Sequence, residues 1–291
     1  MIINFRQLDI FTDKIFSGNP AGVIHLEQDI EGVVKQRIAN ELNLSETVFV
    51  SNSDKADFKL EYFTPVKQID LAGHPTIAAC YSLALENKLF LNEPVTTLNF
   101  ETGKGVIPCQ LHIDNGSISR VVMEQKQPQF KPFAEEGTLL NALQIQESSL
   151  LADYPIEFVS TGLECLIVPA ADLATVQDLF PDFNRLPWHT LVFANEAVSP
   201  IATVHLRFFA PKLGIAEDPA TGTASGALGA YLIKHKIIRG ASPVTMVFEQ
   251  GLEISRPSEI TVEISFNTSD DISNVKVGGK AALAAEGKIY L

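Results

Sequence analysis

The sequence is short of basic residues and of long apolar runs, and each shortage excludes a class of protein. It carries 35 acidic residues against 22 lysines and arginines in 291 residues, a formal net charge of −13. Nucleic acids and anionic membrane surfaces bind basic patches, so we expect neither as a partner. No apolar stretch approaches the length of a membrane span, and the opening "MIINFRQLDIF" lacks the pattern of a signal peptide. We therefore expect a cytoplasmic protein that handles a small molecule.

Cysteine and histidine are also sparse. The three cysteines, Cys80, Cys109 and Cys165, are far apart, which is typical of a reduced chain rather than a disulfide framework. The six histidines include no pair four residues apart, so no metal site is predicted. There is no G-x-G-x-x-G after a strand and no Walker loop, and we expect no cofactor.

The sequence is rich in short runs of β-branched and aromatic residues, separated by Gly, Pro, Asn and Asp. This pattern predicts many strands. With 46% hydrophobic and 20% charged residues, the chain is typical of a well-packed globular protein of one large or two ordinary domains. An amphipathic surface helix is predicted near 29–42, where Val34, Ile38 and Leu42 recur every four residues.

Two further predicted helices, 75–87 and 223–235, are apolar nearly all round and should be buried within sheets. Similar segments precede them, "YFTPVKQIDLAGHPT" and "FFAPKLGIAEDPATGTAS", separated by about half of the chain. This internal repeat indicates an α+β fold of two similar halves related by a pseudo-two-fold axis. Each half is predicted to be a β-barrel-like sheet around a central buried helix. We expect one domain at 1–123 plus 280–291, because the final strand should return to it, and another at 124–279, with an active-site cleft between them.

The first candidate catalytic residue is Glu46, in "ELNLSETVFV". It follows the surface helix and directly precedes an apolar strand, Thr47–Val50. A carboxylate drawn toward a core there would lose hydration, which raises its pKa toward a useful acid/base range. The other interpretation is a solvated or capping glutamate, and position alone favours that one.

The stretch "DLAGHPT" places Gly73 and His74 before Pro75, a residue that suits the first turn of a helix. Helix N-termini attract anions through their N–H groups and dipole. A histidine at this position is therefore a candidate ligand-facing group. A packed, hydrogen-bonded histidine without a ligand is an equally good interpretation.

The stretch "EDPATGT" opens the second buried helix. Adjacent residues of an extended segment point to opposite faces, and Pro219 biases Asp218 to extended geometry. One acid of the Glu217–Asp218 pair can then face a ligand while the other points outward or makes a structural hydrogen bond. Gly222 and Thr223 form a second anion-attracting helix N-terminus, although ordinary capping is the alternative.

Taken together, the motifs "LDIFTDKIFSGNPAGV", "ELNLSETVF", "DLAGHPT" and "EDPATGTASGALGAYL" resemble the PhzF family of phenazine-biosynthesis-like isomerases. The resemblance implies a diaminopimelate-epimerase-like fold and a homodimer. It implies that Glu46 is the acid/base carboxylate, with His74 and Asp218 as its partners. It further implies that three residues line the ligand's polar groups: Gly73, Gly222 and Thr223, the last standing where the family often has serine.

Diaminopimelate epimerase and proline racemase look similar but use two opposed thiols beside the glycines of the helix openings. Here those places hold Ala72 and Thr221, which cannot carry a proton at neutral pH. We therefore expect a cofactor-independent isomerase that moves a proton within a small anionic, carboxylate-bearing substrate. The alternatives are an amino-acid epimerase that uses carboxylates and a catalytically silent metabolite-binding protein of the same fold.

Overall fold

The computed structural model of the chain describes residues 1–267 and 271–291. The chain divides into two compact units, one comprising Met1–Met123 and Gly278–Leu291, the other Glu124–Val277. The return to the first unit falls at Gly278, where the sequence analysis placed it at residue 280. None of the helices in the described residues is long and apolar enough to cross a membrane.

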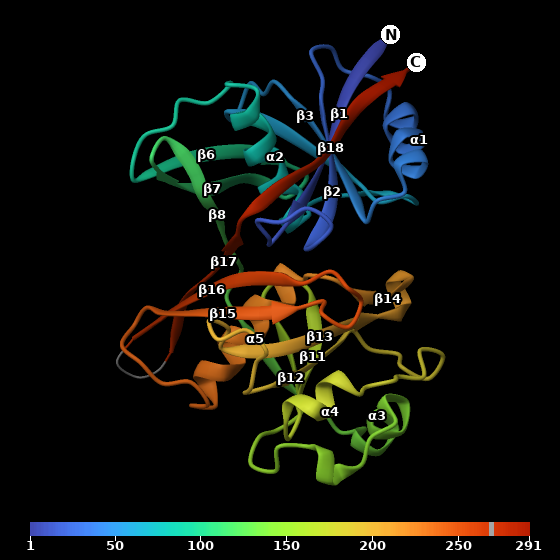
Figure 1. Cartoon of the computed structure of the whole chain (residues 1–291), viewed down its shortest axis with the longest axis vertical. Coiled ribbons are helices and arrows are strands. Elements are labelled where there is room, and N and C mark those ends of the chain that lie inside the picture. Colours follow the sequence, from blue (N-terminus) through green and yellow to red (C-terminus); the bar gives the residue numbers. More distant parts are fainter. Residues whose placement is uncertain (268–270) are drawn as a thin grey trace. The chain divides into compact units, whose positions relative to one another are not determined.

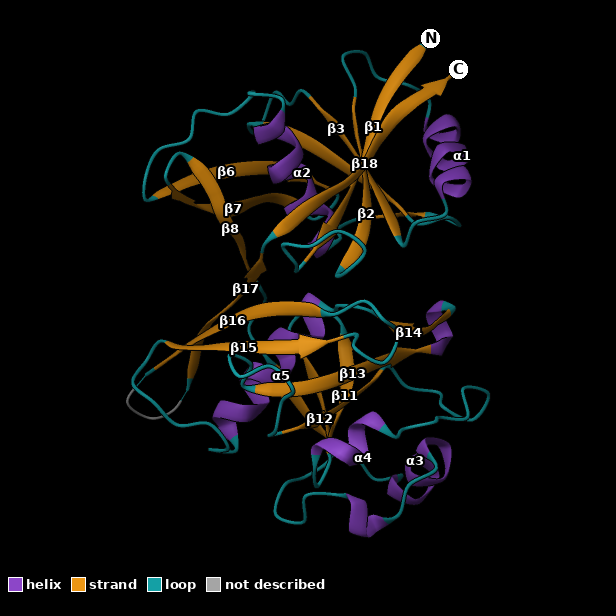
Figure 2. Cartoon of the chain, viewed as in Figure 1, coloured by secondary structure: helices purple, strands orange, loops and turns teal. Residues whose placement is uncertain are grey.

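The first unit consists of strands joined by two helices (Figures 1 and 2). Its elements are β1 (Ile2–Ile10), β2 (Asn19–His25), α1 (Gly32–Leu42), β3 (Glu46–Ser51), β4 (Phe58–Phe63), β5 (Gln68–Ile69), α2 (Gly73–Leu85), β6 (Val95–Thr102), β7 (Gly105–Asp114), β8 (Ser117–Glu124) and β18 (Ala281–Tyr290). Strand β2 pairs in parallel with β3 across α1, and β4 pairs in parallel with β6 across α2. The pairs β3–β4, β4–β5, β6–β7 and β7–β8 are antiparallel.

The second unit repeats this order of connections. Its elements are β9 (Gln129–Pro132), α3 (Glu136–Leu143), β10 (Glu157–Ser160), β11 (Glu164–Pro169), α4 (Leu173–Gln177), β12 (Thr190–Ala194), β13 (Val204–Ala210), β14 (Ile215–Asp218), α5 (Gly222–Lys234), β15 (Val244–Gln250), β16 (Ser258–Phe266) and β17 (Ile272–Gly279), the last ending in the first unit. Strands β11 and β12 are parallel across α4, and β13 and β15 are parallel across α5. The pairs β12–β13, β13–β14 and β15–β16 are antiparallel, so the internal repeat extends to the strand pairing of each unit.

The last strand of the chain pairs with the first. Strand β18 runs antiparallel to β1 from Ile2 opposite Tyr290 to Ile10 opposite Ala281. The N-terminal ammonium donates to Leu291 O at 2.6 Å, and Figure 1 shows the two chain ends side by side. In the second unit, β9 pairs in the same antiparallel sense with β10. The prediction that the final strand returns to the first half is confirmed by this pairing.

Helices α2 and α5 are the buried helices that the sequence predicts. The first begins two residues and the second one residue earlier than predicted. Most residues of α2 and all residues from Ala224 to Ile233 of α5 are buried. Helix α2 packs on β1, β2, β3 and β18, and α5 packs on β10, β11 and β16. A Cβ atom added to Gly229 would lie 2.6 Å from a Val262 methyl, so the close approach of α5 to β16 requires a residue without a side chain.

Helix α1 differs from the expected apolar stripe. Its buried residues are Lys35, Ile38 and Ala39, whereas Val34 and Leu42 are only partly buried. The Lys35 ammonium ends between two carboxylates, 2.5 Å from Glu61 and 2.7 Å from Asp29. A long lysine stem can cover apolar surface while its charge is paired, so a charged residue replaces part of the expected stripe.

Candidate active site

Glu46 is the first residue of β3, and its carboxylate is mostly buried. Its backbone lies opposite Ala21 of the parallel strand β2, and its side chain is 20% exposed. The buried oxygen Oε2 lies 3.2 Å from His74 Nε2, yet no donor is aligned on it for a hydrogen bond among the described residues. This buried oxygen therefore has hydrogen-bonding capacity that no aligned donor in the described part of the chain uses.

His74 is held at the second residue of α2. Its Nε2 lies 3.3 Å from the Ser45 hydroxyl, which in turn donates to Pro20 O at 3.1 Å. The same hydroxyl lies 3.2 Å from Asn19 Oδ1, so the Ser45 oxygen contacts two acceptors as well as the imidazole nitrogen. The structure thus brings Glu46 and His74 together, as predicted, and adds Ser45 as a polar neighbour of the imidazole.

The environment of Glu46 shifts its protonation. Burial raises the pKa of Glu46 to about 6, and the neighbouring Ser45 hydroxyl opposes this shift only in part. A carboxyl group with such a pKa exchanges protons near neutral pH, which suits general acid–base catalysis. The interpretation of Glu46 as a solvated glutamate does not describe this structure.

The opening of α2 is fixed by buried hydroxyl groups. Thr76 donates to Ala72 O at 2.7 Å, and its hydroxyl lies 2.7 Å from the buried Tyr62 hydroxyl of β4. Ala72 is the N-cap and provides no side-chain hydrogen bond to the helix, while Gly73 is exposed. The N-terminus of α2 is consequently rigid but not capped by its own side chains.

In the second unit, the two acidic residues that precede α5 make different contacts. Glu217 makes a bidentate ion pair with the buried Arg207, at 2.9 and 2.7 Å. Asp218 is 8% exposed, and its Oδ2 accepts a hydrogen bond from the Thr221 hydroxyl. The prediction that one of the two acids makes a structural hydrogen bond is confirmed for Glu217. Asp218 also accepts a hydrogen bond within its own turn, and its role toward a ligand stays a prediction.

Helix α5 begins at Gly222, and its N-cap Thr221 gives no side-chain hydrogen bond to the helix. The carbonyls of Gly222 and Thr223 instead accept from Gln125 at 3.3 Å and from Thr161 at 3.1 Å. Ser225 is fully buried and donates to Thr221 O, so it is a packing residue rather than a nucleophile. The N-cap residues of the two buried helices, Ala72 and Thr221, thus make no side-chain hydrogen bond to the helix that each precedes.

The cysteines take no part in these clusters. Cys80, Cys109 and Cys165 are fully buried. Burial raises the pKa of Cys80 well above its usual value and that of Cys165 to about 12. A thiol that stays protonated and inaccessible cannot serve as the proton carrier of a two-thiol racemase.

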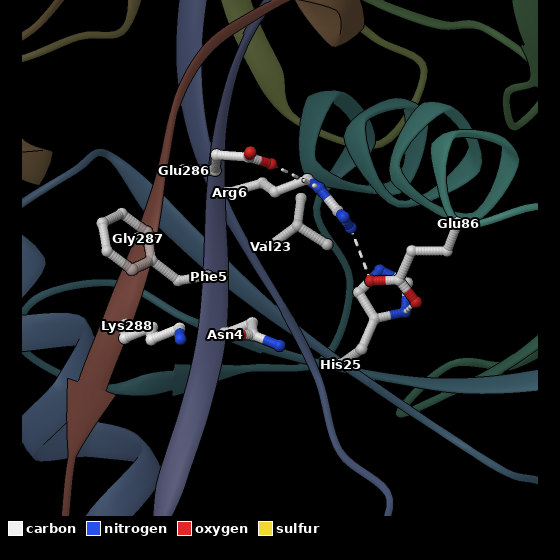
Figure 3. A pocket seen from close by; sticks show the side chains of 9 residues that line it. All are labelled: Asn4, Phe5, Arg6, Val23, His25, Glu86, Glu286, Gly287 and Lys288. Atoms are coloured by element: carbon white, nitrogen blue, oxygen red, sulfur yellow. Dashed lines mark hydrogen bonds and ion pairs between the residues drawn. The ribbon is translucent and has the colours of Figure 1, made fainter.

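A cavity of about 410 Å³ opens on the sheet of the first unit, away from the predicted residues (Figure 3). Its charged groups are largely paired with one another. Arg6 lies 2.5 Å from Glu86, and His25 lies 3.3 Å from Glu86 and 2.8 Å from Ser82. Burial lowers the pKa of His25 to about 4, against the attraction of Glu86, so this imidazole is neutral near pH 7. The cavity contains neither Glu46 nor His74.

Two contributors were not foreseen from the sequence. Ser45 directly precedes Glu46, so its position next to a candidate catalytic residue was the only sequence feature that could have pointed to it. Gln250 contacts Asp218 and Thr221 through its side-chain amide. It has no local signal, because its partners are 29 and 32 residues away.

A doubled α+β fold with a carboxylate and an imidazole at a helix opening is the architecture of the isomerase and epimerase class. The chain belongs to the PhzC-PhzF family of phenazine biosynthesis-like proteins, whose sequence profile matches residues 8–287. It is 34% identical to an uncharacterised isomerase of Clostridium acetobutylicum, over 99% of this chain and 98% of that protein. It is 32% identical to trans-2,3-dihydro-3-hydroxyanthranilate isomerase of Pseudomonas aeruginosa, over 98% of each chain.

The structural comparison agrees with the sequence comparison. The crystal structure of a PhzF-family phenazine biosynthesis protein of Bacillus anthracis matches all of both chains, with a TM-score of 0.91 and 30% identity. The predicted family and fold class are confirmed, and the protein is a PhzF-type isomerase.

The raised pKa of Glu46 has a consequence for stability. Because the folded state binds the proton more tightly than the unfolded state, stability falls as pH rises from about 4.5 to about 6. Glu46→Gln removes the buried charge and should stabilise the protein at pH 7.5 by about 2 kcal/mol, an effect absent below pH 4.5. Urea unfolding of the natural protein and the variant, at pH 7.5 and below pH 4.5, measures this difference in stability. A variant that is not more stable than the natural protein at pH 7.5 contradicts the burial argument.

Proposed function

We propose that this isomerase moves a proton within a small, carboxylate-bearing substrate without a cofactor, and that Glu46 is its acid/base group. The observation that carries the proposal is the Glu46 carboxylate itself. It combines a buried oxygen on which no donor is aligned, a contact with His74, and a pKa of about 6. A single carboxylate of this kind can remove a proton from one carbon atom and return it to another.

The proposed partners of Glu46 bind and orient the substrate. The His74 imidazole lies beside the carboxylate and can donate a hydrogen bond to a developing negative charge. Asp218 is proposed to supply the second carboxylate, which balances charge and fixes the substrate. The backbone of Gly73, Gly222 and Thr223, in the first turns of α2 and α5, is proposed to bind the polar groups of the substrate.

The proposed substrate class is a cyclic, unsaturated carboxylic acid. Supporting this choice is the Pseudomonas aeruginosa relative, whose name gives trans-2,3-dihydro-3-hydroxyanthranilate as its substrate. The helix openings favour anions for the reason given above. A homodimer is the assembly that the family resemblance implies, and it stays a prediction.

Deuterium exchange distinguishes the candidate functions. The protein is incubated in D2O with trans-2,3-dihydro-3-hydroxyanthranilate, and separately with L-amino acids, and the ligand carbons are followed by proton NMR. We expect deuterium to enter a ring carbon of the cyclic acid as it isomerises, because the shuttling carboxylate exchanges its proton with solvent. The Glu46→Gln variant, under the same conditions, is the control for this role.

Each other outcome counts against the proposal in a defined way. Exchange at the α-carbon of an amino acid, without reaction of the cyclic acid, would indicate a carboxylate-dependent epimerase. Saturable binding without exchange of either ligand would indicate a metabolite-binding protein.

A further inference from the structure

The end of β15 packs on the segment that carries Asp218. Gln250, the last residue of β15, is fully buried. Its Nε2 donates to Asp218 O at 2.7 Å, and its Oε1 accepts from Thr221 N at 3.0 Å. One side-chain amide thus spans the turn between the candidate carboxylate and the N-cap of α5.

The orientation of that amide follows from the backbone. Thr221 N–H can only donate, so the Gln250 oxygen must face it, and the Gln250 nitrogen must face the other way. The nitrogen lies 2.7 Å from the carbonyl of Asp218, which can only accept, in agreement with this assignment. The same nitrogen lies 3.2 Å from Thr221 Oγ1.

This arrangement sets the direction of the Thr221 hydroxyl. The hydroxyl has a single hydrogen, and it accepts a hydrogen bond from the Gln250 nitrogen. Its own hydrogen is then directed at Asp218 Oδ2, the partner that it contacts. A hydrogen bond donated to a carboxylate favours the ionised form and fixes its orientation.

The surrounding turn is built to keep this geometry. Ser258 donates to Pro219 O at 2.6 Å. Gly251 has a φ of +81°, and a Cβ atom there would lie 2.5 Å from Pro219 O. A residue with a side chain could not keep this close approach. The residues from Asp218 to Thr221 are therefore held by contacts with the end of β15, the start of β16 and the turn between these strands.

We propose that Gln250 and Thr221 are positioning residues of the isomerase, and that together they hold Asp218 as an oriented carboxylate. The Thr221 hydroxyl lies at the N-cap of α5 and donates to the carboxylate three residues before it. The inference rests on the proposed function in taking Asp218 as the second carboxylate of the reaction. Gln250 acts through Thr221, and neither residue is required to touch the substrate.

The test measures the titration of Asp218 directly. Carbon-13 NMR of the aspartate carboxyl groups is recorded against pH, and the Asp218 signal is identified by its absence in Asp218→Asn. Thr221→Val keeps the shape of the side chain but removes its hydroxyl, so the titration midpoint of Asp218 should rise relative to the natural protein. Thr221→Ser keeps the hydroxyl and should restore the natural midpoint.

Two further variants extend the test. Gln250→Glu replaces the donating nitrogen with an oxygen, so the Thr221 hydroxyl must donate to the introduced carboxylate instead. Both this lost hydrogen bond and the added like charge should raise the Asp218 midpoint. Ser225→Ala removes another hydrogen bond to Thr221, through its carbonyl oxygen, and should leave the midpoint unchanged. In the deuterium-exchange assay, Thr221→Val should lower kcat up to about a hundredfold and move the acidic limb of the pH profile upward.

The outcomes separate this inference from the proposed function. If Thr221→Val and Gln250→Glu are folded and leave the Asp218 midpoint unchanged, the positioning role is overturned whatever the activity. If the midpoint rises while Asp218→Asn keeps full turnover, the positioning network stands and the proposed catalytic role of Asp218 is wrong.

Discussion

Glu46→Gln is expected to lower turnover by about a hundred- to ten-thousandfold, the usual cost of losing general acid–base catalysis. The amide keeps the shape of the side chain and can still form hydrogen bonds, but it cannot accept and return a proton. The folded structure and the affinity for trans-2,3-dihydro-3-hydroxyanthranilate should stay nearly unchanged, and the protein should not be less stable. Steady-state rates, together with binding measured by calorimetry, separate the two effects.

Glu41→Gln is the matched control, because Glu41 lies on the exposed side of α1 only five positions away. It should leave turnover unchanged. His74→Ala and Asp218→Asn should weaken binding as well as the rate, since both are assigned to orientation and charge balance. If Glu46→Gln keeps most of its activity on a verified substrate, the single-carboxylate mechanism fails, and Asp218 is the next residue to test.

His205→Ala is expected to cause a large loss of stability, about 3–5 kcal/mol. His205 is fully buried in β13, between Glu249 at 2.8 Å from Nδ1 and Glu253 at 2.8 Å from Nε2. Glu249 also accepts from the backbone N–H groups of Val198 and Ser199. Removing the imidazole leaves the Glu249 carboxylate without its cation and Glu253 with only the Arg207 guanidinium, 4.0 Å away.

The same cluster predicts a pH dependence. Burial alone would lower the pKa of His205, but the hydrogen bonds that its imidazole donates to Glu249 and Glu253 outweigh burial and raise this pKa to about 9. A raised pKa stabilises the folded state fully below about 6.5, the usual histidine value, and this stability is lost as pH rises through about 9. His205→Gln, which is neutral at every pH, should lose less stability than the natural protein between pH 7 and 10.

Denaturant unfolding at pH 7 and pH 10 measures both effects. Arg185→Ala is the matched control, because Arg185 pairs with Asp182 at 3.3 Å on the surface and is 74% exposed. Its loss should cost about 1 kcal/mol or less, as for other exposed ion pairs. If His205→Gln and the natural protein lose the same amount of unfolding free energy between pH 7 and pH 10, His205 is not the buried cation described above.

The sequence by itself determined the features that depend on local pattern. Helices α2 and α5 are apolar on every side, so burial was the only way to remove that surface from water. The similar segments that precede these two helices indicated an internal repeat, and the strand pairing of each unit shows it. The position of Glu46 at a junction between a surface helix and an apolar strand marked it as a candidate without any knowledge of its neighbours.

Only the tertiary structure decided which polar groups meet. The register of β13 against its neighbours fixes His205 between Glu249 and Glu253, more than forty residues along the chain. The parallel pairing of β15 with β13 brings Gln250 to Asp218, and the packing of α1 on β4 brings Lys35 to Glu61. Burial of apolar surface is additive along a segment and can be read from spacing. Hydrogen bonds and ion pairs are directional and short, so they exist only where strand register and helix packing set two distant atoms within about 3 Å of each other.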